Sequence, residues 1–306
     1  MYHYVAYGLH IISDLLLPEL QASQNDKADV DLVIHRGKID CNLPMPFESW
    51  DYFHLDGDTA YLCWKIVGKF QVCSGKEIII EPFADVKEHL IRLPLLGSVL
   101  AMALHQRQFL VLHGSAVAIE DGAAIFVGAS GQGKSTMAAT LCSRGHQLAS
   151  DDVAALQINT EKCNLIPGFP QMKLWSETAR AILGDEAENL KPIHPEVDKL
   201  ARPTVDNFYS RPLPLKAIFL LRKGEVIRIT SLKPQAAMTT LIANSFIPML
   251  IGNKFQKDKL TAFHFYQCLK LINIVPIYIL ERPCSLNLLP NVADLIENLF
   301  KTPVNL

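Results

Sequence analysis

The feature that most constrains this chain is a glycine-rich segment with the sequence Gly128-Ala129-Ser130-Gly131-Gln132-Gly133-Lys134-Ser135. The segment fits the pattern G-x-x-x-x-G-K-[ST], in which glycines allow a tight turn and successive backbone N–H groups face a phosphate at the start of a helix. The apolar run 125–127 before it predicts a strand, and residues 136–141 after it predict a helix. This strand–loop–helix pattern predicts that the chain binds a nucleoside triphosphate, either ATP or GTP.

Individual side chains of the loop have distinct expected tasks. Lys134 is expected to reach the β- and γ-phosphates, and the hydroxyl of Ser135 is expected to complete the coordination of Mg²⁺. The backbone from Gly128 to Thr136 is expected to surround the phosphates.

The composition is that of an ordinary soluble globular protein, with 49% hydrophobic and 20% charged residues among 306. A formal net charge of −2 without a lysine or arginine block argues against a nucleic-acid partner. Seven scattered cysteines without a C-x-x-C pair indicate reduced thiols. The first residues lack a signal-peptide pattern, and the apolar run 95–104 is too short to span a bilayer. We therefore expect a cytoplasmic protein without a membrane partner.

Residues 1–84 are predicted to form a smaller, mostly β N-terminal module, because short β-branched or aromatic runs alternate with Gly, Asp and Asn. The predicted strands lie at 4–9, 30–34, 60–64, 70–72 and 77–80. They carry no catalytic signature, and we interpret the module as one for recognition. Residues 85–106 follow a helical pattern with a break expected at Pro94, and this connecting segment is predicted to pack between the two halves of the chain.

Residues 107–306 are predicted to form an α/β nucleotide-binding catalytic domain. A strand over 109–119 should turn at Gly122 into the strand before the loop, and the helix after the loop should end near Gly145. Ser176 is predicted to cap a helix over 176–183, and residues 185–214 are predicted to form a long functional loop. The other predicted elements are hairpins over 153–158 with 163–166 and 217–221 with 226–229, helices over 233–244, 258–272 and 286–301, and a strand over 276–280.

Three further residues surround the loop in the predicted fold, since His113 ends one apolar strand and Asp151 and Asp152 end another. Ligands of open α/β sheets bind where strands end, and a carboxylate beside a phosphate loop commonly holds Mg²⁺. Because neighbouring side chains alternate on a strand, one aspartate can serve the metal while the other takes the proton of an acceptor hydroxyl. We expect Ser135 and Asp152 to hold the metal, and His113 to tune the base or to contact the γ-phosphate.

The order of three segments resembles the HPr kinase/phosphorylase family: Leu112-His113-Gly114-Ser115-Ala116-Val117, the glycine-rich loop, and Arg144-Gly145-His146-Gln147-Leu148-Ala149-Ser150-Asp151-Asp152. The resemblance implies an α/β fold, namely a P-loop kinase domain of the HPr kinase/phosphoenolpyruvate carboxykinase type, which transfers a phosphoryl group to a serine hydroxyl. By the same resemblance, Asp151 matches the proton-accepting aspartate of the family, Asp152 its partner, and His113 the histidine nearby.

The chain departs from that family after the paired aspartates. The family carries a Glu-Val/Ile-Arg-Gly-Leu-Gly segment that supports the reverse, phosphorylase reaction, whereas residues 167–175 contain no carboxylate. The resemblance therefore implies neither the reverse, phosphorylase reaction nor HPr as the substrate. Tyr7-Gly8-Leu9 and Lys173-Leu174-Trp175 instead resemble divergent HPr-kinase-related proteins. Some of these phosphorylate a serine of ribosomally made peptides, including lasso peptides, which implies a peptide or small-protein partner; a homo-oligomer is also open.

Lys199 and Arg202 are candidates to neutralise the transferring phosphoryl group. Two other hypotheses remain beside a serine kinase: a kinase of the same fold that acts on a sugar or polyol, and a nucleotide-binding regulatory module without catalysis. A carboxykinase is the least favoured, because no second metal site or oxaloacetate-binding set is evident.

Overall fold

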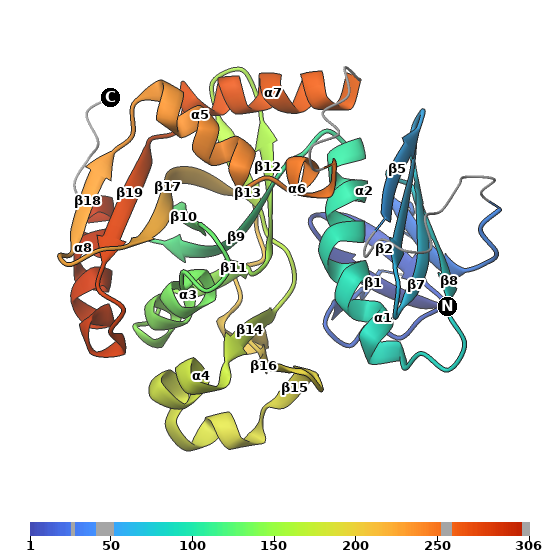
Figure 1. Ribbon diagram of the computed structural model, residues 1–306, viewed down its shortest axis with the longest axis horizontal. Coiled ribbons are helices and arrows are strands. Elements are labelled where there is room, and N and C mark those ends of the chain that lie inside the picture. Colours follow the sequence, from blue (N-terminus) through green and yellow to red (C-terminus); the bar gives the residue numbers. More distant parts are fainter. Residues whose placement is uncertain (26–27, 41–51, 252–258, 302–306) are drawn as a thin grey trace.

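The computed structural model describes residues 1–25, 28–40, 52–251 and 259–301. It is a mixed α/β structure with two eight-stranded sheets and one three-stranded sheet (Figure 1). We call them the N-terminal sheet (strands within 2–82), the central sheet (strands within 110–166 and 213–282) and the small sheet (strands within 171–203). Within the described ranges, no helix is long and apolar enough to cross a membrane.

The N-terminal sheet consists of β1 (Tyr2–Ala6), β2 (Leu9–Ser13), β3 (Gln21–Ala22), β4 (Leu32–Arg36), β5 (Tyr52–Asp56), β6 (Thr59–Trp64), β7 (Gly68–Cys73) and β8 (Glu77–Pro82). Their order in the sheet is β3-β1-β2-β4-β8-β7-β6-β5. Strand β4 pairs in parallel with β2 and β8. Alternating burial in β2 and β7 shows that one face of this sheet is packed and the other is more exposed.

The predicted single strand over 4–9 is wrong, because the chain turns within it. Tyr7 and Gly8 have φ values of +53° and +68°, and β1 and β2 pair on either side of them. Two central residues with positive φ form the turn that fits the twist of a two-residue hairpin. Strands β2, β3 and β5 also went unpredicted.

The connecting segment forms α1 (Glu88–Pro94), a π-helical turn η1 (Leu95–Val99) and α2 (Leu100–Gln106). The break expected at Pro94 lies instead at Gly97, whose φ of −103° and ψ of −109° are not helical. Pro94 is the last residue of α1, and the helical path is interrupted three positions later.

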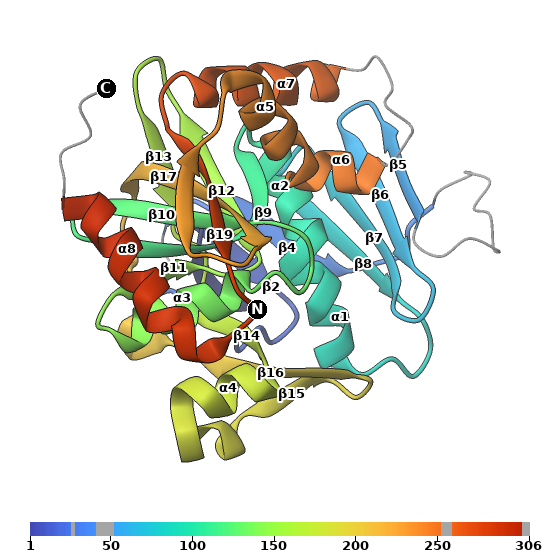
Figure 2. The same ribbon diagram turned by 60° about the vertical axis from the view of Figure 1, so that its left-hand side comes forward.

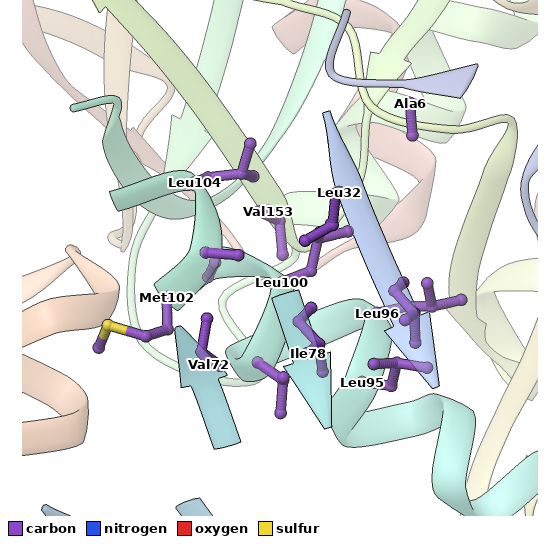
Figure 3. Packing of buried hydrophobic residues seen from close by; sticks show 14 of the residues in the cluster. Ala6, Leu32, Val72, Ile78, Leu95, Leu96, Leu100, Met102, Leu104 and Val153 are labelled. Carbon is purple, nitrogen blue, oxygen red and sulfur yellow. The ribbon is translucent and has the colours of Figure 1, made fainter. Parts of the chain in front are cut away.

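These helices share one buried cluster with both large sheets. Leu32 and Ile78 come from the N-terminal sheet, Leu100 from α2, and Val153 from the central sheet (Figure 3). All four side chains are at most 1% exposed. The connecting helices therefore lie between the N-terminal sheet and the central sheet, and the apolar contacts run without interruption across them.

The central sheet contains β9 (Leu110–Ile119), β10 (Gly122–Val127), β11 (Gln147–Ser150), β12 (Val153–Ile158), β13 (Cys163–Ile166), β17 (Leu213–Lys223), β18 (Arg228–Ser231) and β19 (Ile277–Arg282). Its order is β10-β9-β12-β13-β17-β19-β18, with β11 paired to β9. Strand β10 also pairs in parallel with β17. The long strands β9 and β17 therefore each have different partners at their two ends, which closes β9, β10, β17, β13 and β12 into a ring of pairings.

Helices cover both faces of the central sheet, which explains why its strands are almost continuously apolar. Phe126 faces α3 (Lys134–Ser143) and α8 (Leu289–Lys301), whereas Ile125 faces α5 (Pro234–Ala243) and α7 (Lys259–Ile272). Figure 2 shows α3 beside α8, and α5 beside α7 on the other side of the sheet. The shorter helical segments are η2 (Gly184–Asn189), η3 (Val205–Asn207), α6 (Phe246–Ile251) and η4 (Leu286–Leu288).

The predicted long loop over 185–214 is wrong, because most of it is regular structure. It holds η2, β15 (Lys191–His194), β16 (Val197–Pro203) and η3, and β16 pairs with β14 (Gln171–Trp175) to form the small sheet beside α4 (Ser176–Leu183). Prolines and charges hid the strand pattern of β15 and β16, whose residues are exposed or only partly buried. Ser176 does not cap α4 either, since its hydroxyl donates to Asp198 and the residue at the cap is Trp175.

The predicted hairpin of 217–221 with 226–229 is also wrong in its pairing, although both strands exist. Strand β19 lies between them, parallel to β17 and antiparallel to β18. A short turn at Lys223-Gly224 suggests direct pairing, but β19 arrives from more than fifty positions later in the chain. By contrast, β12 and β13 pair antiparallel at the predicted positions.

Candidate active site

The glycine-rich loop lies between the end of β10 and the first residue of α3, in the predicted strand–loop–helix context. Gly128, Gly131 and Gly133 have φ values of +146°, +78° and +86°, a region that side-chain-bearing residues rarely adopt. A Cβ on Gly133 would also lie 2.2 Å from Nη2 of Arg282. The backbone conformation therefore favours glycine at Gly133, and a larger residue there would also displace the Arg282 guanidinium.

Lys134 begins α3 and is 9% exposed. Its Nζ donates hydrogen bonds to the carbonyl oxygens of Gly128 at 2.9 Å and Ala129 at 3.3 Å. Burial lowers the pKa of Lys134, while the carboxylates of Asp151 and Asp152 act in the opposite direction. The ammonium group thus lies across the loop, with negative charge nearby.

Asp151 is 5% exposed, and its carboxylate accepts hydrogen bonds at both oxygens. Its Oδ1 accepts from the hydroxyls of Ser115 at 2.6 Å and Ser135 at 2.9 Å, and its Oδ2 accepts from the backbone N–H of Lys173 at 2.8 Å. Burial raises the pKa of Asp151 despite these hydrogen bonds. The carboxylate is therefore fixed in direct contact with the last hydroxyl of the glycine-rich loop.

Asp152 belongs to a different set of contacts. Its carboxylate lies 3.1 Å from Nδ1 of His113 and 2.9 Å from Nζ of Lys173. Burial alone would raise the pKa of Asp152, but the Lys173 ammonium and the hydrogen bond from His113 outweigh it and hold the pKa well below its usual range. The His113 ring packs edge-on against Phe246, with 5.5 Å between ring centroids.

The expected pairing of Ser135 with Asp152 differs from this geometry, in which Ser135 contacts Asp151. The backbone explains the exchange, because Asp152 has a φ of +75°. Strand β11 ends at Ser150, before both aspartates, so the two carboxylates do not simply alternate as they would on a regular strand.

One pocket brings most of the predicted residues together. It is lined by the loop residues Ser130, Gly131, Gly133, Lys134, Ser135 and Thr136 and by His113, Asp151, Asp152 and Lys199. Gly128, Ala129 and Gln132 belong to the same loop. Lys134, Lys173 and Lys199 bring positive charge to this pocket, which suits a polyphosphate.

Arg202 is the predicted site residue outside the glycine-rich loop that does not line this pocket. It lies on β16, three positions after Lys199, so the two side chains leave opposite faces of the strand. Burial raises the pKa of the Cys142 thiol in α3, and the positive charge of Arg202 acts in the opposite direction. Lys199 instead lies over the ring of Trp175, 4.9 Å from its centroid, at the pocket wall.

Three residues of the site had no predicted role. Ser115 is two positions after His113 on β9, and the period of two along a strand was a usable signal for it. Lys173 pairs with Asp152 from the small sheet, which the sequence pattern did not reveal as a sheet. Arg282 ends β19 and donates to the carbonyl of Gln132 at 3.0 Å, a contact that depends on a strand 150 residues away in sequence.

The site fits a magnesium ion held together with a nucleotide. Mg²⁺ prefers oxygen ligands and is usually held by one or two protein groups, substrate phosphates and water. The Ser135 hydroxyl and the Asp151 carboxylate, 2.9 Å apart beside the loop, provide such a donor set. Among the described residues, no group of three or more His, Cys, Asp or Glu side chains is arranged to hold a metal ion.

No protein-family model and no curated protein matches this chain. Among solved structures, it is similar to the Hpr(Ser) kinase/phosphatase from Coxiella burnetii at 14% sequence identity and a TM-score of 0.34. That similarity covers 62% of this chain and 95% of the other. At this identity and TM-score, the similarity does not bear on function, which has to be inferred from the contacts within the site itself.

Proposed function

We propose that this protein is an ATP-dependent kinase that transfers the γ-phosphoryl group to a serine hydroxyl of a peptide or small protein. One observation carries the proposal: Asp152, paired with His113 and Lys173, lines the same pocket as the glycine-rich loop with Lys134 and Ser135. A carboxylate in that position is available to an acceptor, while the loop and its lysine are available to a polyphosphate. GTP would fit the same phosphate-binding groups.

The two aspartates divide the work in this proposal. Asp151 and Ser135 would hold Mg²⁺, since their side chains lie within hydrogen-bonding distance of each other beside the loop. When bound, the ion neutralises charge on the β- and γ-phosphates. Asp152 receives the proton of the acceptor, because its carboxylate is not tied to the loop hydroxyl. This assignment exchanges the roles that the family resemblance gives to Asp151 and Asp152.

The reaction step follows from these positions. The acceptor oxygen forms a bond to the γ-phosphorus, and the bond from that phosphorus to the β,γ-bridging oxygen breaks. The nucleoside diphosphate leaves with the electron pair of the broken bond. The acceptor proton goes to Asp152. Because its pKa is held low, the Asp152 carboxylate is a weak base, and its main contribution is to accept the hydrogen bond of the acceptor hydroxyl and position it in a loose transition state. Lys134, Lys173 and Lys199 supply positive charge around the transferring group.

The test is to incubate the purified full chain with MgATP and serine-containing peptides, including those encoded beside its gene, and to look for phosphoserine by mass spectrometry. Asp152→Asn should lower turnover by at least about 100-fold, which is the lower range for loss of a positioned proton acceptor. ATP binding, measured by calorimetry, should be largely kept. Absence of any phosphopeptide while ATP binds normally would refute the proposal.

The same variants separate a kinase from a regulatory module that only binds nucleotide. If the protein is a kinase, Lys134→Ala and Asp152→Asn should each fail to restore the phenotype of cells that lack the gene. For a regulatory module, Lys134→Ala abolishes the phenotype while Asp152→Asn leaves it intact, because only nucleotide binding is needed.

A further inference from the structure

A second cavity of about 350 Å³ adjoins the phosphate pocket. It reaches the lower end of the size range of ligand pockets in proteins. Its walls come from the N-terminal sheet, the connecting helices and α6, and they are mainly apolar: Trp64, Val67, Leu90, Leu93, Pro94 and Phe246. The two large halves of the molecule therefore build it together.

The two cavities meet at His113 and Asp152, which line both. A molecule whose apolar part fills the second cavity thus places a group attached to that part beside the Asp152 carboxylate. Under the proposed function, that group is the hydroxyl that receives the phosphoryl group. The two cavities thus share His113 and Asp152 as a common part of their walls.

The chemistry of the walls selects among acceptors. Apart from His113 and Asp152 at the junction, the polar side chains that line the cavity are Ser98 and His194, and no lysine or arginine is among the described lining residues. A sugar or polyol needs many hydrogen-bond partners, and burying its hydroxyls without them is costly. An anionic acceptor lacks a counter-charge here. An apolar or aromatic side chain meets both conditions.

We infer that this cavity is the acceptor subsite and that it takes a bulky apolar side chain next to the serine that is phosphorylated. The inference rests on the proposed function and names its substrate class: a peptide with a residue such as leucine or phenylalanine beside the acceptor serine. The N-terminal sheet then contributes directly to specificity, through Trp64 and Val67 at the end of β6 and in the following turn.

Binding of small probes tests the subsite without turnover. N-acetyl-Ser-Phe-amide, N-acetyl-Phe-Ser-amide and the corresponding glycine and aspartate probes are titrated calorimetrically into the full chain with Mg²⁺ and a non-hydrolysable ATP analogue. One of the two phenylalanine probes should bind about tenfold or more tightly than its glycine counterpart, as expected for burial of an aromatic side chain. The aspartate probes should bind no better than glycine.

Two exposed residues give a matched pair of variants. Ile66 lies at the rim of the cavity and is 65% exposed, while Val226 lies in the turn between β17 and β18 and is 56% exposed. Ile66→Glu should reduce the preference for phenylalanine over glycine severalfold, and Val226→Glu should leave it unchanged. A second cavity variant, Leu90→Ala, should also reduce it, and unchanged binding of the ATP analogue shows that each variant is folded.

Equal binding of the phenylalanine and glycine probes overturns the inference, and so does an equal effect of Ile66→Glu and Val226→Glu. These results are distinct from failure of the proposed function. If serine peptides are phosphorylated without any apolar preference, the kinase proposal stands and the subsite is wrong. If the phenylalanine probe binds at the cavity but no peptide is ever phosphorylated, the cavity binds apolar side chains but is not an acceptor subsite, and the kinase proposal is wrong.

Discussion

At the scale of single residues, the site separates two adjacent carboxylates by giving them different partners. Asp151 is held by two hydroxyls and a backbone N–H, whereas Asp152 is held by Lys173 and His113. Their pKa values move in opposite directions, upward for Asp151 through burial and downward for Asp152 through the Lys173 charge. Groups whose surroundings push their pKa values apart are suited to different tasks in one reaction.

Lys173 is therefore expected to control the pH dependence of the reaction through Asp152. In the native protein the pKa of Asp152 is held low, so the carboxylate stays ionised as the pH falls below neutral. Lys173→Met removes the main charge that opposes burial, so the pKa of Asp152 rises and the acidic limb of the kcat/KM profile moves to higher pH. Lys199→Met is the control, because Lys199 lines the pocket but forms no described ion pair with Asp152. Equal pH shifts in both variants would contradict this role.

Tyr7 is expected to position Asp152 from the N-terminal sheet. Its hydroxyl is buried and donates to the carbonyl of Val153 at 3.1 Å, one residue after Asp152. Tyr7→Phe should cost about 1 kcal/mol of stability, as for a lost hydrogen bond, and should lower kcat while the affinity for ATP is kept. Tyr4→Phe is the matched control, since the Tyr4 oxygen accepts from the backbone N–H of Leu17 within the N-terminal sheet. It should cost similar stability in a thermal melt and leave kcat unchanged; a drop in kcat for both variants would indicate a general effect of destabilisation.

At the scale of elements, the segment Arg144-Gly145-His146 stabilises the packing of two helices. Arg144 and His146, which follow α3, both contact Glu297 on α8, at 2.7 Å and 3.1 Å. Arg144 also pairs with Asp294. These contacts fasten α8 to the end of α3, on the face of the central sheet where the two helices pack together. The two-residue spacing of Arg144 and His146 is thus explained by the contact of both side chains with one glutamate of α8.

The Glu297 contacts should make stability depend on pH. Hydrogen bonds from Arg144 lower the pKa of Glu297 to about 2 in the folded protein, against about 4.3 in an unfolded chain. The stabilisation is therefore complete above about pH 4.3 and is lost as the pH falls toward 2. Glu297→Gln should lower stability at pH 7 by about 0.2–1 kcal/mol, because the Arg144 partner is partly exposed. In thermal melts, the difference in melting temperature between Glu297→Gln and the native protein should be smaller at pH 3 than at pH 7. Asp121→Asn, which removes an exposed partner of Lys216, should change neither melt.

Local patterns in the sequence predicted elements whose partners are close in the chain. The strand, loop and helix around Lys134 and the β12–β13 hairpin are such cases, because a turn residue and an apolar run define each of them. The pairing of β17 with β19 failed to follow from local signals, since the strand between β17 and β18 comes from a distant part of the chain. The small sheet was missed for another reason: β15 and β16 contain no buried residue, so they lack the apolar alternation that marks a half-buried strand, and the alternation in β14 covers only five residues.

The same distinction applies to the site. The positions of Lys134, Asp151 and Asp152 beside the loop could be predicted, because Lys134 lies in a glycine-rich motif and the two aspartates directly follow a strand. The expectation that His113 ends a strand is wrong, since His113 is the fourth of the ten residues of β9. The contacts of Lys173 with Asp152 and of Arg282 with Gln132 could not be predicted, because they depend on how distant strands are placed. The role of Tyr7 likewise required knowing that the first hairpin packs beneath the paired aspartates, where its hydroxyl reaches Val153.

At the scale of the whole molecule, the N-terminal sheet and the central sheet share one apolar cluster. Ile78 and Leu100 contribute to it from the N-terminal sheet and α2, and Val111, Val153 and Phe169 contribute from the other half. Each of these side chains is at most 4% exposed. The sequence-based division at residue 84 therefore cuts through a continuous set of buried contacts, and separating the halves would expose apolar surface on both.

We accordingly expect the chain to unfold as one cooperative unit. Calorimetry should give a single transition whose calorimetric and van't Hoff enthalpies agree. Leu100→Ala removes a side chain from the cluster shared by both halves, and Leu141→Ala removes one from the cluster between α3 and α8. Each should cost about 2–5 kcal/mol, as for buried leucines, and each should shift the whole transition to lower temperature. If the N-terminal sheet were an independent domain, Leu141→Ala would move only one of two transitions and leave the other in place.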